Sequence, residues 1–290
     1  MKIFNFFFFT TLIAIILNKK HVKKYRKSRG IKTKNYLNSC TFPYHYDEDR
    51  YKGTFLLNKV NAEDRDFLSE KINRVIYCFW TGENDLTPNR LKGLKSLQNN
   101  SGIKVELITP KNLSNYIKPE DPLPEGYQYL SYIHRADYLR TYFMHHYGGG
   151  YADIKTISYS WKNAFDRLEN SNAYGIGFPE EGFYGVPKVK NKNLRYDTQN
   201  YWRLLITNCV YIFRPYTKFT EEWLNEAKRR IYLNLNKLKK HPAKDPFGKN
   251  KDYPIGWSYL LGQIFHPLCL KYHHRILQDT SLSFSTKDYR

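Results

Sequence analysis

The chain has 290 residues, of which 41% are hydrophobic and 17% aromatic. This length suits one medium-sized or two small domains, and the composition gives no sign of intrinsic disorder. The formal net charge of +20 favours contacts with phosphates, acidic lipids or nucleic acid without choosing among them. The four cysteines lack the spacing of metal ligands, and they are too few for disulfide bonds to be the main stabilisation of a domain of this size.

The beginning of the chain predicts a membrane attachment. An uncharged apolar run from Ile3 to Leu17 is followed by a basic run. The apolar run is shorter than the usual span of about 20 residues, although short segments suit thinner internal membranes. No small-residue cleavage site follows it, so we expect a single-pass anchor over residues 1–18 rather than a removed signal peptide.

The rest of the chain divides into two regions. Residues 19–70 are polar and tyrosine-rich without lasting periodicity, which predicts a stem with short irregular structure. From residue 71 strands and helices alternate, and this alternation indicates one α/β domain over residues 71–290, with a mostly parallel sheet covered by helices. The expected strands are 74–80, 102–108, 150–154, 173–178 and 206–213, and the expected helices are 91–98, 112–117, 129–147, 219–235 and 254–272.

Two glycines and one proline mark helix ends in this pattern. The longest helical pattern, 129–147, has an apolar stripe that recurs every three or four residues and stops at Gly148 and Gly149. Helices commonly end in this way at a residue in the left-handed conformation. Pro267 is expected to break the last helix.

Asp137 and Arg140 lie at the edge of the apolar stripe of this long helix. At about 100° per residue, Arg140 falls about 40° from Ala136. The pair is explained as an ordinary helical ion pair worth a few tenths of a kcal/mol. It is equally placed to flank Asp153, where the next strand ends and ligands of open α/β sheets bind. A sugar hydroxyl or phosphate would then partner these polar groups.

The stretch IHRADYLRTYFMHHYGGGYADIKT, residues 133–156, resembles a known pattern. It is similar to the S-D-x-x-R…Y-G-G-x-Y-x-D-x-D pattern of sugar-nucleotide glycosyltransferases with the DXD motif. This group includes yeast-type mannosyltransferases, capsular polysaccharide synthesis enzymes and glucosylating bacterial toxins. RVIYCFWTG (74–82) looks like the opening strand of that family, and TNCVYIF (207–213) like a later one. The resemblance implies a GT-A, Rossmann-like nucleotide-diphospho-sugar transferase domain over residues 71–290.

The resemblance also implies roles for single residues. Asp137 and Arg140 would contact the donor sugar and, with Asp153, form the catalytic centre. Trp80 would lie against the nucleotide base, although a core aromatic at a strand end explains it as well. The residues expected to bind the donor are Trp80, Asp137, Arg140, Tyr151, Asp153, Lys155 and Asn208. Trp257 and His266 are candidates for the acceptor or phosphate side, and each is also explained as structural.

Lys155 stands where the family carries its second aspartate, a ligand of a metal ion bound to the diphosphate. An ammonium group repels Mg²⁺ or Mn²⁺, which want oxygen ligands. Lys155 itself could neutralise the diphosphate, Asp153 could keep a weakly held metal with a ligand from elsewhere, or the chain could be inactive. The sequence favours a working enzyme with a divalent cation retained on Asp153, because Lys155 can turn aside beyond it.

These observations predict a membrane-anchored glycosyltransferase. It would move a hexose from a nucleotide-diphosphate sugar to a hydroxyl of a glycan, lipid or protein, with retention of anomeric configuration as in its relatives. The alternatives are an inactive sugar- or nucleotide-binding protein and, less favoured, a nucleic-acid-binding protein, so no nucleic-acid partner is expected. Basic residues after the anchor favour a cytosolic catalytic domain, whereas the resemblance favours an ER or Golgi lumen, and the side of the membrane stays open.

Overall fold

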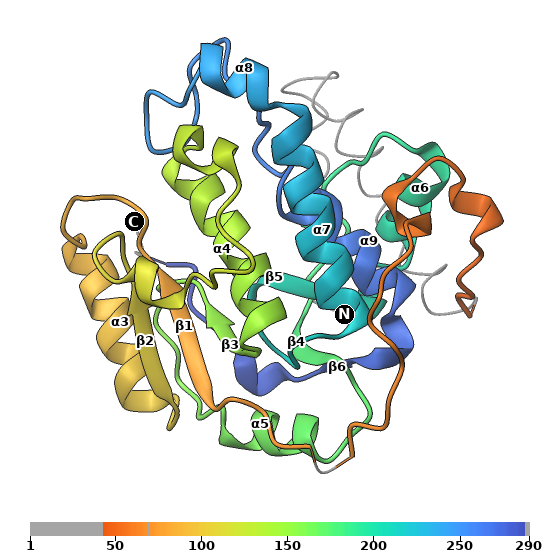
Figure 1. Ribbon diagram of the computed structural model, residues 1–290. Helices are drawn as coiled ribbons and strands as arrows, with labels where there is room; N and C mark the ends of the chain where they lie inside the picture. The colour runs from red at the N-terminus through yellow and green to blue at the C-terminus, as the bar shows by residue number, and fades with distance from the viewer. Residues whose placement is uncertain (1–42, 69, 288–290) are drawn as a thin grey trace, which may run out of the picture.

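The computed structural model describes residues 43–68 and 70–287 (Figure 1). The predicted anchor, residues 1–18, lies outside the described residues. Within the described ranges, no helix is both long and apolar enough to span a bilayer.

In the described part of the chain, a six-stranded sheet has the order β2-β1-β3-β5-β4-β6. β1 pairs in parallel with β2 and β3, and β4 pairs in parallel with β6, whereas β5 runs antiparallel between β3 and β4. The predicted mostly parallel sheet is therefore confirmed, with β5 reversed. The carboxyl ends of β1, β3 and β4 and the amino end of β5 meet at one edge, which we call the carboxyl edge. The strands are β1 (Val75–Phe79), β2 (Lys104–Ile108), β3 (Gly149–Ala152), β4 (Gly175–Pro179), β5 (Ile206–Phe213) and β6 (Ile276–Gln278).

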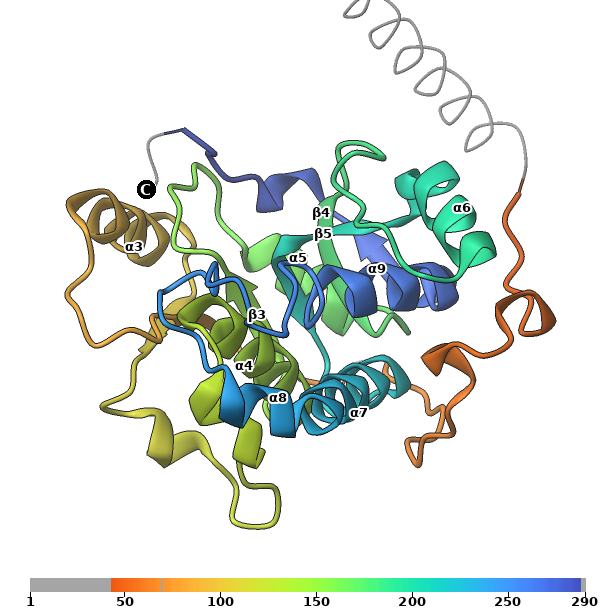
Figure 2. The same cartoon turned by 90° about the horizontal axis from the view of Figure 1, so that it is seen from above.

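Helices cover both faces of the sheet (Figures 1 and 2). One face is covered by α4 (Tyr132–His146), α7 (Lys218–Leu233) and α9 (Gly262–Lys271), and the other by α3 (Pro88–Asn100) and α5 (Lys162–Glu169). The other α-helices are α6 (Lys192–Asn200) and α8 (Leu235–Lys240). Short 3-10 helices are η1 (Asp49–Tyr51), η2 (Phe55–Leu57), η3 (Leu113–Tyr116), η4 (Glu125–Tyr129), η5 (Trp202–Leu204), η6 (His273–Arg275) and η7 (Thr280–Leu282).

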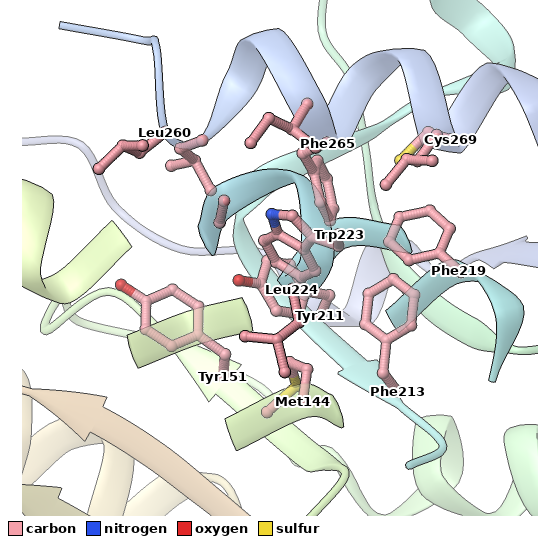
Figure 3. Close-up of a cluster of buried hydrophobic side chains, with 14 of the residues drawn as sticks. Met144, Tyr151, Tyr211, Phe213, Phe219, Trp223, Leu224, Leu260, Phe265 and Cys269 are labelled. Atoms are coloured by element: carbon pink, nitrogen blue, oxygen red, sulfur yellow. The ribbon is translucent and has the colours of Figure 1, made fainter. Parts of the chain in front are cut away.

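Each face of the sheet buries its own hydrophobic cluster, because successive strand residues point to opposite sides. In β1, Tyr77 and Phe79 face α4, whereas Ile76 and Cys78 face α3 and α5. The larger cluster is rich in aromatic side chains, and Figure 3 shows part of it between β3, β5, α7 and α9. The ring centroids of Trp223 and Phe265 lie 4.9 Å apart. Burying one such side chain contributes about 1.5–3 kcal/mol.

Most predicted elements are confirmed with ends shifted by a few residues, although α9 begins at Gly262 rather than at 254, and α5, α6, α8 and β6 were not predicted. The expected break at Pro267 is wrong, because α9 continues through it. Proline has no N–H to donate to the carbonyl oxygen of Gln263 one turn earlier. Arg230 Nη2 lies 3.4 Å from that oxygen and donates to it instead. The carbonyl oxygen that loses its partner within α9 is therefore hydrogen-bonded by Arg230 of α7, and the helix continues through the proline.

The described part of the predicted stem packs on the domain. Tyr51 and Phe67 are fully buried in the larger cluster. Arg50 donates two hydrogen bonds to the carboxylate of Asp197 in α6, at 2.5 and 3.0 Å. The buried guanidinium of Arg214 donates to the carbonyl oxygen of residue 70 at 2.9 Å. The domain boundaries at residues 18 and 70 stay predictions.

The turn from α4 into β3 depends on Gly148 and Gly149, whose φ angles are +60° and +81°. Both lie in the left-handed region that disfavours side chains. A Cβ atom at position 149 would also lie 2.7 Å from the carbonyl oxygen of Val75 and 2.8 Å from that of Asn73. The predicted glycine end of the helix is thus confirmed, and at Gly149 the neighbouring backbone excludes any side chain.

We expect Gly149→Ala to destabilise the protein more than Gly53→Ala. Gly53 has a similar φ of +76°, but a Cβ there would meet nothing within 4 Å. Gly53→Ala should cost about 1–2 kcal/mol for its conformation, and Gly149→Ala about 1–3 kcal/mol more for overpacking. Urea unfolding of both variants measures the difference. Equal losses would show that the backbone contact at Gly149 is unimportant.

Candidate functional site

Four charged residues meet at the carboxyl edge, and we call them the charged cluster: Asp137, Arg140, Asp153 and Lys155. Arg140 Nη2 lies 3.5 Å from Asp137 Oδ1 and 3.4 Å from Asp153 Oδ1. Lys155 Nζ lies 3.0 Å from Asp153 Oδ2. The structure therefore joins the residues of α4 to those that follow β3, as the sequence prediction required.

Arg140 connects three elements of the fold. Its Nη1 donates to the carbonyl oxygen of Asn208 in β5 at 2.8 Å. Its guanidinium carbon lies 4.4 Å from the ring centroid of Tyr151 in β3, and the Tyr151 hydroxyl donates to Asp153 Oδ1 at 2.6 Å. Nε of Arg140 is buried with no hydrogen-bond partner among the described residues. The guanidinium is thus held firmly while one of its donors is left unused.

The two aspartates of the charged cluster have opposite pKa shifts. Burial raises the pKa of Asp153, but the positive charges of Arg140 and Lys155 outweigh it and lower that pKa to about 2. Burial dominates at Asp137 and, despite Arg140, raises its pKa to about 7. Asp153 is therefore a carboxylate at neutral pH, whereas Asp137 exchanges a proton near neutral pH.

Lys155 is buried, with 6% of its side chain exposed. Its ammonium donates to Cys209 Sγ at 3.5 Å and lies 4.5 Å from the ring centroid of Phe284. Phe284 comes from the C-terminal segment, whose next residue, Ser285, donates its N–H to the carbonyl oxygen of Thr156 at 2.9 Å. A distant part of the chain thus covers the side chain of Lys155.

The backbone of residues 153–155 is held on its other face by α3. A Cβ added at Gly93 would lie 3.1 Å from the carbonyl group of Ile154, so the helix approaches the backbone closely. Arg90 Nη1 donates to the Ile154 carbonyl oxygen at 2.9 Å. Contacts from α3 and from the C-terminal segment therefore fix the position of Asp153 and Lys155.

The donor set around Asp153 does not fit a divalent cation. Both carboxylate oxygens lie within 3.4 Å of a positively charged nitrogen. Across residues 43–68 and 70–287, no three His, Cys, Asp or Glu side chains are grouped so as to hold a metal ion. Mg²⁺ and Mn²⁺ need several oxygen ligands, which two neighbouring cations would oppose. The Mg²⁺ or Mn²⁺ site on Asp153 stays a sequence prediction that these neighbours do not favour.

The remaining donor candidates lie at the carboxyl edge but away from the cluster centre. Trp80 follows β1 and packs against the hydrophobic cluster on the α3 face of the sheet. Its indole N–H donates to the carbonyl oxygen of Asn84 at 2.6 Å. Asn208 meets Arg140 through its backbone carbonyl, and its amide nitrogen lies toward Gly262 at the start of α9. The predicted roles of both residues stay predictions.

The two acceptor-side candidates have different surroundings. Trp257 is 63% exposed in the segment before α9. His266 is fully buried in α9, with Nε2 3.3 Å from Glu180 Oε2. That contact lacks hydrogen-bond geometry, and neither ring nitrogen of His266 has a hydrogen-bond partner in the described structure. Only Trp257 is open to a large ligand without rearrangement.

Sequence reasoning missed Glu180, Arg90 and Phe284. Glu180 follows β4 directly, so the rule that ligands bind at carboxyl ends of strands pointed to it. A Cβ at Gly185 would lie 2.2 Å from Glu180 Oε1, which shows how closely the following loop covers this carboxylate. The contact of Phe284 with Lys155 joins segments that are far apart in sequence, so no local sequence pattern predicts it.

We expect Asp137→Asn to change how stability depends on pH. An aspartate in the unfolded chain has a pKa of about 4, and the folded value for Asp137 is about 7. Since the folded state holds the proton more tightly, the stability contributed by Asp137 is full below pH ~4 and is lost as pH rises through ~7. As the pH rises from ~4 to ~7, the free energy of unfolding of the variant should therefore increase relative to that of the native protein, by at most about 1.4 kcal/mol per pH unit.

Urea unfolding at several pH values measures this difference. Burial lowers the pKa of His134 to about 4, which acts in the opposite direction but equally in both proteins, so the comparison cancels it. Asp252→Asn, at an exposed position, is the matched control and should give a difference that does not vary with pH. A flat difference for Asp137→Asn would contradict the raised pKa.

Residues 48–206 match the family described as capsular polysaccharide synthesis protein. The match runs from η1 to the start of β5 and includes the charged cluster. No curated protein matches the chain. The family match agrees with the capsular branch of the resemblance found in the sequence, and because it covers more than half of the 290 residues, the chain belongs to the capsular polysaccharide synthesis protein family.

Proposed function

We propose that this protein is a glycosyltransferase that moves a hexose from a nucleotide-diphosphate sugar to a hydroxyl group of an acceptor. The family membership supports a glycosyltransferase-like role in glycan synthesis. The observation that carries the proposal is the charged cluster at the carboxyl edge of a mostly parallel sheet. Ligands of open α/β sheets bind at such edges, and carboxylates suit the vicinal hydroxyls of a sugar.

The charge of the cluster supports an anionic ligand. Arg140 and Lys155 bring two positive charges to Asp153, which is ionised, and to Asp137, which is only partly ionised at neutral pH. The sum is positive, and it lies in a partly desolvated site where electrostatic interactions are stronger than in water. We propose that Arg140 and Lys155 neutralise the diphosphate of the donor, without a requirement for a divalent cation.

In the proposed reaction the acceptor oxygen forms a bond to the anomeric carbon of the donor sugar. The bond between that carbon and the diphosphate oxygen breaks, and its electron pair leaves with the diphosphate. The proton of the acceptor hydroxyl passes to the leaving diphosphate oxygen, so no separate general base is needed. Arg140 and Lys155 would stabilise the charge that grows on this oxygen, which is where preorganised donors are most effective. The proposed outcome is retention of anomeric configuration.

The order of the strands supports an arrangement of the two substrates. Trp80 after β1 and Asn208 in β5 flank the charged cluster on opposite sides along the carboxyl edge. The nucleotide would extend toward Trp80, whose flat ring suits a base. The acceptor, a glycan, lipid or protein, would approach from the side of His266 and Trp257. We further propose that Trp257 contacts the acceptor directly, and that His266, which is fully buried beside Glu180, contacts it only after a rearrangement.

Asp153→Asn should lower turnover by roughly 100-fold or more, because the amide cannot keep Arg140 and Lys155 at their present positions as a charged partner does. The assay incubates the full chain with a panel of UDP- and GDP-sugars and measures the nucleoside diphosphate released. Asp252→Asn, at an exposed position, is the control and should turn over normally. Unchanged turnover in Asp153→Asn would reject the proposed site. If the native chain releases no nucleotide and shows no thermal shift with any donor, the inactive alternative is correct.

Lys155→Met should weaken the binding of UDP or GDP by about tenfold or more, since a hydrogen bond to a charged group contributes about 1.5–3 kcal/mol. Methionine keeps much of the aliphatic contact with Phe284 but not the charge. Calorimetry with each nucleotide, with EDTA or with Mn²⁺, measures the effect, and EDTA should leave native binding unchanged. Lys162→Met, at an exposed position, is the control. Native binding that requires Mn²⁺ would disprove metal independence and restore the metal on Asp153.

A further inference from the structure

Residues 229–257 form a segment with many exposed basic and aromatic side chains, and we call it the docking face. Four large hydrophobic side chains are exposed there: Tyr232 (74%), Leu233 (59%), Phe247 (41%) and Trp257 (63%). The exposed basic side chains around them are Arg229, Lys237, Lys239, Lys240, Lys244, Lys249 and Lys251. Scattered exposed apolar residues need no explanation, but this many within one short segment, surrounded by lysines, indicate an interaction surface.

The segment has two acidic residues, Asp245 and the exposed Asp252, against the seven exposed basic side chains. Asp245 accepts hydrogen bonds from the backbone N–H groups of Phe247 and Lys249, at 2.8 Å each, which hold the turn and leave its negative charge in place. Lys239 pairs with Glu125 at 2.5 Å and Arg229 with Glu226 at 2.6 Å, so the positive charge of the face comes mainly from Lys237, Lys240, Lys244, Lys249 and Lys251. The face therefore keeps a strong positive charge.

The docking face is fixed to the helix that carries the charged cluster. The N–H of Ile133, in the first turn of α4, donates to the carbonyl oxygen of Pro246 at 3.2 Å. The N–H of Ala243 donates to the carbonyl oxygen of Tyr129 at 3.1 Å, and that of Ser131 to the Tyr253 hydroxyl at 3.1 Å. Figures 1 and 2 show α8 and the loop after it passing beyond the N-terminal end of α4. The face thus lies beside the carboxyl edge and cannot move independently of it.

The side chains of the face match the surface of a bilayer. Trp and Tyr prefer the headgroup level, where one end of the side chain is apolar and the other wet. Lysines near an anionic leaflet each add about 1 kcal/mol of attraction. Lys249 Nζ lies 5.1 Å from the ring centroid of Phe247, an arrangement in which the ring can enter the interface while the ammonium stays among phosphates. Leu233 offers no stacking surface to a nucleobase but suits an acyl chain.

We propose that the docking face binds the surface of an anionic lipid bilayer. Trp257, Phe247, Tyr232 and Leu233 enter the interface, and the lysines contact acidic headgroups. The contact is separate from any attachment through the beginning of the chain. It orients the molecule so that the carboxyl edge opens beside the membrane surface. Together with the proposed function, on which this one consequence rests, the orientation presents the active site to an acceptor carried on a lipid.

The test uses the full chain reconstituted into vesicles whose acyl chains carry bromine, which quenches nearby tryptophan. Trp257 is isolated by subtracting the spectrum of Trp257→Phe, and Trp202→Phe in η5 is the control tryptophan. We expect quenching of Trp257 in vesicles of phosphatidylcholine and phosphatidylglycerol, little quenching in phosphatidylcholine alone, and loss of quenching at high salt. Because every sample is reconstituted, tethering by the start of the chain is equal in all of them.

A charge variant separates the docking face from the overall charge of the protein. Lys237→Gln, Lys239→Gln, Lys240→Gln and Lys244→Gln together should lower the ratio of docked to undocked molecules about tenfold or more. The matched control removes the same charge from exposed positions on α3, α5 and β2: Lys92→Gln, Lys95→Gln, Lys104→Gln and Lys162→Gln.

Three results would overturn the proposal. They are equal Trp257 quenching in zwitterionic and anionic vesicles, equal losses in the two lysine variants, and protection of Trp257 by a single-stranded oligonucleotide but not by vesicles. None of these readouts depends on turnover. If the vesicle results hold and no sugar is transferred, the docking face stands and the proposed function fails.

Discussion

The guanidinium of Arg140 is the interaction on which the arrangement of the site depends. It contacts Asp137 on its own helix, Asp153 beyond β3 and the backbone of Asn208 in β5. Burying an arginine costs several kcal/mol unless its charge and its donors find partners. Those partners come from three elements, so the positive charge can be buried only when α4, β3 and β5 have assembled. The same requirement fixes the distances within the charged cluster.

Two aspartates beside one arginine are not equivalent, and the difference comes from Lys155. Asp153 has a second cation at 3.0 Å, which favours its ionised form. Asp137 has only Arg140 as a positively charged neighbour, and the effect of burial on its pKa is larger than the effect of that charge. A second aspartate at position 155 would reverse this balance, because like charges in contact raise each other's pKa. It would also need a counter-ion of its own, and in a DXD site a metal supplies it. We propose that the lysine at this position supplies the positive charge instead.

Much of the fold could be predicted from the sequence because its signals are local. Strand runs, the apolar stripe of α4 and the glycines after it each depend on neighbouring residues, and all three predictions are confirmed. Pro267 shows the limit of this reasoning, since Arg230 from another helix supplies the bond that rescues α9. Within the site, Asp137, Arg140 and Asp153 could be joined because strand and helix periodicities place them on facing sides. The cover over Lys155 could not, because Phe284 reaches it only through the complete fold.

The glycine turn between α4 and β3 determines how far Asp153 lies from Arg140. Side chains alternate along β3, so Tyr151 and Asp153 face α4, while Ala152 and Ile154 face α3. Insertion of one residue between α4 and β3 would move Asp153 to the α3 face or rotate Arg140 by about 100° away from the sheet. The tight approach of Gly149 to the β1 backbone opposes such a slip, because a Cβ at this position would collide with the carbonyl oxygens of Val75 and Asn73. A residue without a side chain thus sets the separation of the charges that we propose to bind the donor.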